Sequence, residues 1–148
     1  MLIVFLVLCA GAVLLIRFLP PVVAEAHVDP ESAAEPGHGG VKRIGEGAPV
    51  FAGSPARVLN ALSEIAMATP RTALVAGSAT DGMITFVVRS RVFRFQDYVT
   101  FKATAEGSDT RLSILARTRY PGASDWGVNR KRLEQWLADL SERVGEAG

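Results

Sequence analysis

The sequence has little of the side-chain chemistry on which most enzyme sites depend. It contains one cysteine, Cys9, and two histidines, His27 and His38, and all three lie in the first forty residues. Residues 41–148 therefore have no thiol nucleophile, no disulfide, no histidine-based triad and no cysteine–histidine metal cluster. The two histidines lie in a stretch that predicts no rigid scaffold to hold ligands, so we expect neither a metal nor a cofactor.

Carboxylates are the only remaining acid–base groups for catalysis. Asp97 and Asp125 are the candidates, because each lies beside a predicted turn and near arginines that keep it ionised. Structural ion pairs explain both residues more simply. We therefore favour a binding or structural role over an enzymatic one and assign no catalytic residue.

Charge is absent from the first sixteen residues, MLIVFLVLCAGAVLLI, and the apolar run continues past Arg17 to Leu19. This run predicts a transmembrane helix over residues 1–19 that ends at Pro20-Pro21, with the Arg17 head group at the interface. The expected location is the bacterial inner (cell) membrane, as a single-pass protein, with the side of the soluble part left open. A cleaved signal peptide and a lipoprotein modified at Cys9 are the alternatives.

Residues 20–47 are poor in apolar periodicity and contain prolines, glycines and acidic residues, which is typical of a linker. Residues 1–40 carry one basic and four acidic groups, a net charge of −3. Residues 41–148 carry fifteen basic and eleven acidic groups, a net charge of +4. The net charge of the whole chain is therefore close to zero, although an acidic linker precedes a basic domain predicted over residues 48–148.

The domain shows the pattern of an α+β fold. Ser54 and Pro55 open a predicted helix as its cap and first residue, and apolar residues recur at helical spacing through residue 66. Strands are expected over residues 71–76, 83–95, 98–106 and 111–120, and a last amphipathic helix over residues 124–143. The prediction is an antiparallel sheet of about four strands with two helices packed on one face.

The Gly107-Ser108 turn fixes a register for two of these strands. It pairs Phe101 with Ile114 and Val99 with Ala116, which places apolar side chains on one face. The other face then gathers five cations: Arg89, Arg91, Lys102, Arg117 and Arg119.

These cations suit two interpretations. A solvated sheet face of a structural or protein-interaction domain, for example in an envelope complex, needs no ligand. A membrane held close by residues 1–19 instead favours binding of an anionic lipid headgroup or small anionic ligand, because arginine matches phosphate and carboxylate geometry. Nucleic acid is not expected, because the net charge of +4 is modest and no binding motif is present.

The segments RSRVFRFQDYVTFKA and SDWGVNRKRLEQWLADL, with PVFAGSP and HVDP before them, resemble the domain of unknown function 1499 family of bacterial and plastid proteins. The resemblance implies a membrane-tethered domain and no known chemistry. Arg94-Phe95-Gln96 departs from the family's usual Gly-aromatic-Pro turn, and Pro121-Gly122-Ala123 replaces a shorter link. The family's pattern highlights Ser90, Arg91, Asp97, Tyr98, Arg117, Arg119, Ser124, Asp125, Gly127 and Asn129.

The last motif, SDWGVN, also has a physical interpretation of its own. Ser124 or Asp125 is expected to cap the final helix, and Asn129 to donate from its amide to a nearby loop. Gly127 is expected to permit close approach of helix and sheet. This motif is thus predicted to dock the last helix.

Overall fold

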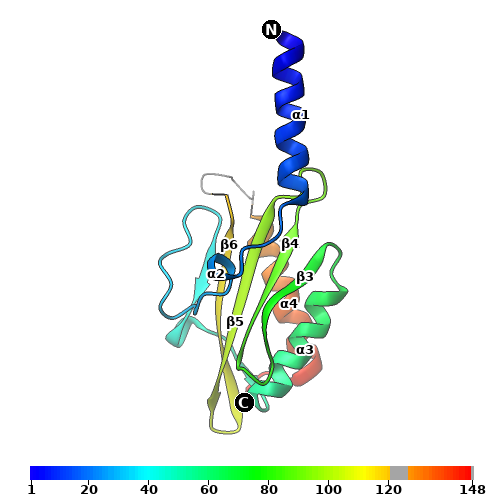
Figure 1. Ribbon diagram of the computed structural model, residues 1–148. Coiled ribbons are helices and arrows are strands. Elements are labelled where there is room, and N and C mark those ends of the chain that lie inside the picture. The colour runs from blue at the N-terminus through cyan, green and yellow to red at the C-terminus, as the bar shows by residue number, and fades with distance from the viewer. Residues whose placement is uncertain (121–126, 148) are drawn as a thin grey trace.

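An antiparallel sheet of six strands forms the centre of the protein. The computed structural model describes residues 1–120 and 127–147. The strands lie in the order β1-β6-β5-β4-β3, and β2 also pairs with β6 (Figure 1). In chain order the elements are α1 (Leu2–Phe18), α2 (Val23–Ala26), β1 (Val41–Arg43), η1 (Gly45–Gly47), β2 (Val50–Ala52), α3 (Pro55–Ala68), β3 (Thr72–Ser78), β4 (Met83–Arg89), β5 (Gln96–Glu106), β6 (Asp109–Thr118) and α4 (Val128–Val144).

The α+β class is as predicted, but the sheet is larger than the four strands expected. The two extra strands, β1 and β2, have three residues each, which is too short for an alternating pattern to be recognised in the sequence. Both are held by antiparallel pairing with β6. β1 lies in the stretch expected to be a linker.

The expected transmembrane helix is wrong. Within the described residues, no helix combines the length and the apolar content that crossing a bilayer requires. α1 ends at Phe18 because Leu19, which precedes Pro20, adopts an extended backbone with ψ 129°. At 1.5 Å per residue, its seventeen residues extend about 25 Å, which is short of the roughly 30 Å of a hydrocarbon core.

The two long helices of the domain begin and pack much as their sequences indicate. The Ser54 hydroxyl accepts a hydrogen bond from the Arg57 backbone N–H, and Pro55 occupies the first turn of α3. The apolar stripes of both helices are buried. They are Val58, Leu59, Leu62, Ile65 and Ala66 in α3, and Leu133, Trp136, Leu137, Leu140 and Val144 in α4.

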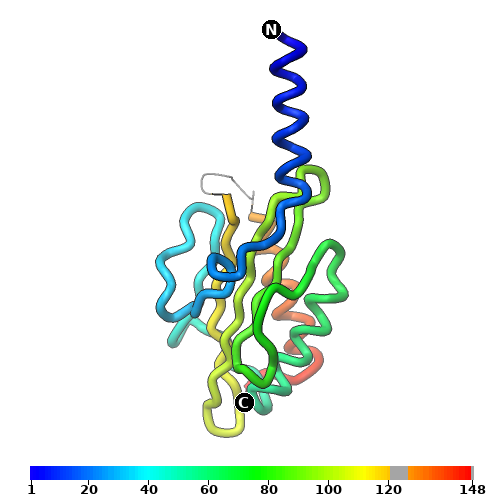
Figure 2. Tube along the Cα trace, in the orientation of Figure 1, coloured from blue at the N-terminus to red at the C-terminus, as the bar shows by residue number. Residues whose placement is uncertain are grey.

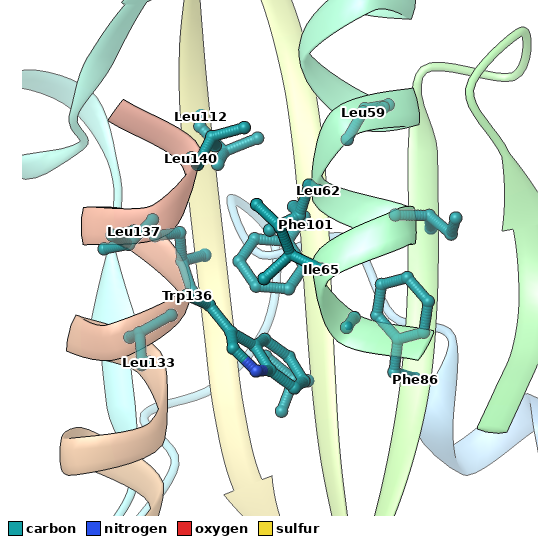
Figure 3. Packing of buried hydrophobic residues seen from close by; sticks show 14 of the residues in the cluster. Leu59, Leu62, Ile65, Phe86, Phe101, Leu112, Leu133, Trp136, Leu137 and Leu140 are labelled. Carbon is teal, nitrogen blue, oxygen red and sulfur yellow. The ribbon is translucent and has the colours of Figure 1, made fainter. Parts of the chain in front are cut away.

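The core lies between these helices and one face of the sheet (Figure 3). The Trp136 ring of α4 packs against Phe86 of β4 and Phe101 of β5, with ring centroids 6.1 and 6.2 Å apart. Its indole Nε1 donates a 2.8 Å hydrogen bond to the Thr69 hydroxyl at the end of α3. The indole nitrogen, the only polar atom of the Trp136 side chain, therefore has a hydrogen-bond partner. Trp136 thus links α3 and α4 to each other and to the same face of the sheet.

The register of the central hairpin is confirmed, but the strand before it is shorter than predicted. Phe101 lies opposite Ile114, and Val99 lies opposite Ala116. β4, however, ends at Arg89, which pairs with Gln96. Residues 90–95 therefore form a connecting loop, where a continuous strand was expected.

Candidate functional site

The face of the sheet opposite α3 and α4, here called the outer face, carries four of the five predicted cations. The antiparallel register arranges its side chains in cross-strand rows. Gln96 lies between Arg89 and Arg119 in one row, and Tyr98 lies beside Arg117 in the next. Lys102 is two rows further along. Arg91 does not belong to this face, because β4 has ended and the residue is exposed in the 90–95 loop.

The outer face is covered by the protein's own chain. Residues 19–40, here called the strap, leave the base of α1, cross the sheet and turn back beside β6 (Figure 2). Ala26 of the strap is fully buried and packs with Val87 and Tyr98. The Ala26 carbonyl accepts a 3.1 Å hydrogen bond from the Thr100 hydroxyl. The expected linker therefore lies against the domain, although the division of the chain into anchor, linker and domain stays a prediction.

Acidic residues of the strap neutralise Lys102 at the middle of the outer face. Its ammonium lies 2.7 Å from the Asp29 carboxylate and 2.9 Å from the Glu31 carboxylate. Burial raises the pKa of Asp29, but hydrogen bonds from Lys102 and the Glu31 backbone outweigh it, so the pKa lies below its ordinary value. The hydrogen bonds that Lys102 donates to the Asp29 and Glu31 carboxylates raise the pKa of Lys102. Each charge thus stabilises the other.

Polar groups hold the strap where it leaves α1. The Gln96 amide donates a 2.7 Å hydrogen bond to the Leu19 carbonyl, and Arg119 donates one of 2.9 Å to the Pro20 carbonyl. The Tyr98 hydroxyl accepts from the Val22 backbone N–H at 3.3 Å. Arg119, which was predicted to bind an anion, therefore also binds the strap backbone.

His27 also takes part in docking the strap onto the sheet. Its Nδ1 lies 2.8 Å from the Thr85 hydroxyl, which in turn lies 2.8 Å from the Thr100 hydroxyl. The ring lies over β3, where a Cβ added to Gly77 would approach within 2.9 Å of the imidazole Cε1. Gly77 also has a φ of 81°, so this position needs glycine for two reasons.

The 90–95 loop lies next to the base of α1 and carries exposed apolar side chains. Ser90 closes the loop, because its hydroxyl accepts from the Phe95 backbone N–H and its own N–H donates to the Phe95 carbonyl, both at 2.9 Å. Val92 and Phe93 at the tip are 66% and 47% exposed. The Arg17 guanidinium of α1 donates to the Val92 carbonyl, which joins helix and loop.

A cationic cluster surrounds this loop. Arg89 contains a buried nitrogen, Nη1, without a hydrogen-bond partner. Burial, followed by the nearby charge of Arg94, lowers the pKa of Arg89 from its ordinary value. Among the described residues, none of Arg17, Arg91 and Arg94 forms an ion pair with a carboxylate. Positive charge at this end is therefore less compensated than at the middle of the outer face.

Asp97, Gly127 and Asn129 lie on the helix side of the sheet. The Asp97 carboxylate of β5 forms a 3.6 Å ion pair with Arg132 of α4, which also donates to the Asn129 side-chain oxygen at 2.9 Å. Gly127 caps α4 with a φ of 76°. No atom of the described residues lies within 4 Å of an added Cβ there, so the backbone conformation is the observed reason for glycine. Ser124 and Asp125 lie outside the described residues.

A cavity of about 470 Å³ lies between the strap and β6. The strap contributes Glu25, Val28 and residues 33–38 to its wall. The sheet contributes Tyr98, Leu115 and residues 117–119. Two of the predicted anion-binding arginines, Arg117 and Arg119, thus share a cavity, whereas Lys102 and Arg91 lie outside it.

Sequence reasoning missed the acidic partners of these cations. Glu25, Asp29 and Glu31 were assigned to a solvated linker because their segment has no apolar periodicity. The signal that could have found them was the contrast in net charge, −3 before residue 41 and +4 after it. Opposite charges in neighbouring segments of one chain favour contact between the segments.

Together the strapped sheet, the two covering helices and the projecting apolar helix define a small α+β domain whose outer face is closed by its own N-terminal segment. The sequence matches the family described as protein of unknown function (DUF1499) over residues 20–140, and the chain belongs to this family. The match includes nearly all of the strap. No curated protein matches the chain.

Proposed function

We propose that this protein is a membrane-attached module that binds anionic lipid headgroups with the end of the domain from which α1 projects. The observation that carries the proposal is the juxtaposition of an exposed apolar helix with Arg17, Arg91 and Arg94 at its base, which form no ion pair within the part of the chain that the structure describes. The headgroup site is thereby assigned to Arg17, Arg91 and Arg94, and not to the middle of the outer face. The expected bacterial cell membrane is the proposed location.

The character of α1 supports a lipid partner. Except for Arg17 in its last turn, the helix has no charged residue, and none of its residues is buried. An apolar surface of this size in water is unfavourable, and its transfer to hydrocarbon gains about 25 cal/mol per Å². The helix projects away from the sheet, so its apolar surface is free to contact a membrane surface (Figure 1).

The 90–95 loop supports contact with the membrane surface at the same level. Val92 and Phe93 supply apolar side chains that can enter the lipid interface, and Arg91 and Arg94 flank them. Each basic residue close to an anionic leaflet contributes about 1 kcal/mol. The strap carboxylates do not compete for these arginines, because they are engaged at Lys102, Lys42 and Arg119.

Vesicle flotation tests the proposal on the full chain. We expect wild-type protein to bind vesicles containing phosphatidylserine more tightly than vesicles of phosphatidylcholine alone. The double variant R91Q/R94Q should lose roughly 10- to 30-fold of this preference, because two charges contribute about 1 kcal/mol each. Binding to the neutral vesicles, which depends on α1, should not change.

The matched control removes two cations at the opposite end of the domain. Arg57 lies in the first turn of α3 and Arg143 in the last turn of α4, and these ends of the two helices lie far from α1 (Figure 1). The variant R57Q/R143Q has the same net charge as R91Q/R94Q and should bind like wild type. Equal losses in both double variants would show that only net charge matters and would contradict the proposed site. Failure of wild type to bind any vesicle would contradict membrane attachment and favour a protein-interaction role.

A further inference from the structure

We infer that the cavity between the strap and β6 is a binding site for a small organic carboxylate with a short apolar body. This site is distinct from the proposed membrane-contacting end and does not depend on membrane attachment. Its volume of about 470 Å³ lies in the range of small-molecule sites in proteins. Its wall combines two arginines with apolar side chains, which is the composition that an amphipathic anion requires.

Arg117 provides the first reason to assign an anion. Its Nη2 donates to the Glu25 backbone carbonyl, but its Nε is buried without a hydrogen-bond partner. A guanidinium presents Nε–H and Nη–H side by side, and a carboxylate oxygen is their natural acceptor. A buried charged donor left without a partner is unfavourable, and a bound carboxylate would satisfy it.

Arg119 provides a second cation with an incomplete set of partners. Its Nη1 donates to Pro20 and to the Gln96 side-chain oxygen. Its Nε lies 3.8 Å from the Glu25 carboxylate, which is too far for a hydrogen bond. The Arg119 side chain is only 15% exposed, so its charge is partly desolvated, and the carboxylate with which it pairs among the described residues is loosely held.

The acidic residues of the cavity lie at its opening. The Glu25 side chain is 60% exposed, and Glu35 is 83% exposed and forms an ion pair with Lys42. The Arg117 Nε and the Arg119 side chain are thus more buried than the two carboxylates. A small anion can displace the loose Glu25 contact and reach both arginines, whereas a large polyanion would meet the acidic opening. Val28, Ala33, Pro36 and Leu115 provide the apolar wall.

The test uses butyrate as the probe and the full chain in a neutral detergent micelle. We expect a saturable shift of the Arg117 Nε–H nuclear magnetic resonance signal, because the carboxylate becomes its acceptor. Butan-1-ol, which has the apolar body without the charge, should produce no such shift. Inorganic phosphate should bind more weakly than butyrate, because it lacks the apolar body.

Variants distinguish binding in this cavity from non-specific attraction of butyrate to positive charge. R117Q should weaken butyrate binding at least 10-fold, as read from the backbone signals of residues 115–119. R143Q, which removes an arginine on α4, should bind like wild type. If R117Q does not fold, A34F decides, because it fills the cavity from the exposed strap and leaves both arginines intact; it too should lose binding.

Three results would overturn the inference. The first is unchanged butyrate binding in a folded R117Q or A34F protein. The second is equal binding of butan-1-ol and butyrate, which would indicate apolar adsorption. The third is tighter binding of phosphate than of butyrate. Loss of vesicle binding in R91Q/R94Q leaves this cavity intact, so the two proposals fail separately.

Discussion

Arg94 occupies a backbone conformation that suits glycine better than arginine. Its φ is 62°, in the left-handed region. A side chain in this region costs roughly 1–2 kcal/mol, and glycine avoids that cost at an entropic penalty of about 0.5–1 kcal/mol. The family's pattern has glycine at this turn, and glycine adopts a positive φ without strain. Arg94 is therefore a strained position.

We predict that R94G stabilises the protein by about 0.5–1 kcal/mol in urea unfolding. R94Q is the matched control, because it removes the charge that repels Arg89 but keeps the Cβ. The gain of R94G over R94Q isolates the backbone contribution. A stability of R94G equal to or below that of R94Q would show that the loop relaxes the strain by other means.

Some site residues were placed correctly from the sequence and others were not, depending on whether a local sequence pattern determines their position. The register from Gly107-Ser108 placed Arg117 and Lys102 on the outer face correctly, because alternation along a strand has a period of two. Arg91 was misplaced because apolar residues continue past Arg89, and only the hydrogen bonds of Ser90 reveal the turn. The partners of the cations come from residues more than seventy positions away, which no local pattern encodes.

At the scale of elements, the strap is the part that sequence reasoning assigned least well. Prolines, glycines and acidic residues are typical of solvated linkers, and the strap contains all three. Its order comes from specific partners on the sheet, among them Thr100, Tyr98 and Lys102. The helices were predicted well because their caps and apolar stripes are local signals.

The Asp29–Lys102 pair makes strap docking sensitive to acid. The pKa of Asp29 is lower in the folded protein than in the unfolded chain. Its contribution to stability is therefore complete above the unfolded value of about 3.9 and is lost as pH falls through the folded value. We predict a loss of up to roughly 1 kcal/mol below about pH 4, limited because both side chains are partly exposed.

The variant D29N should lack this part of the acid-induced loss when unfolding is measured from pH 7 to pH 2. The control D139N removes a carboxylate from α4, on the other side of the sheet, and should keep it. If the free energy of unfolding of D29N falls at low pH as steeply as that of wild type, other carboxylates cause the loss.

At the scale of the molecule, the sequence indicated the α+β class correctly, but the transmembrane helix predicted over residues 1–19 was wrong, and nothing in the sequence showed how α1 joins the domain. The helix is shorter than the apolar run, because Pro20-Pro21 diverts the chain onto the sheet. The strap then fixes the end of α1 beside the 90–95 loop. The structure consequently predicts different effects for removing the helix and removing the strap.

We predict that deletion of residues 1–18 changes the melting temperature by no more than about 2 °C, because no residue of α1 is buried. Deletion of residues 1–40 should lower the free energy of unfolding by about 2–5 kcal/mol, since it exposes Tyr98 and Val87 and removes the strap hydrogen bonds. Calorimetry of the two truncated proteins and the full chain measures both effects. Equal stability of the two truncated proteins would show that the strap contributes nothing to the fold.

The covering of the outer face also sets an order of events during protein synthesis. Residues 19–40 are translated before every strand that they contact, and β6, which forms one wall of their binding surface, ends at Thr118. Contacts across such sequence separations form late, because the intervening chain must be ordered first. The strap therefore remains undocked while about eighty further residues are synthesised and leave the ribosome. During that interval its carboxylates are free, and any cationic partner available on the nascent chain or nearby can compete for them.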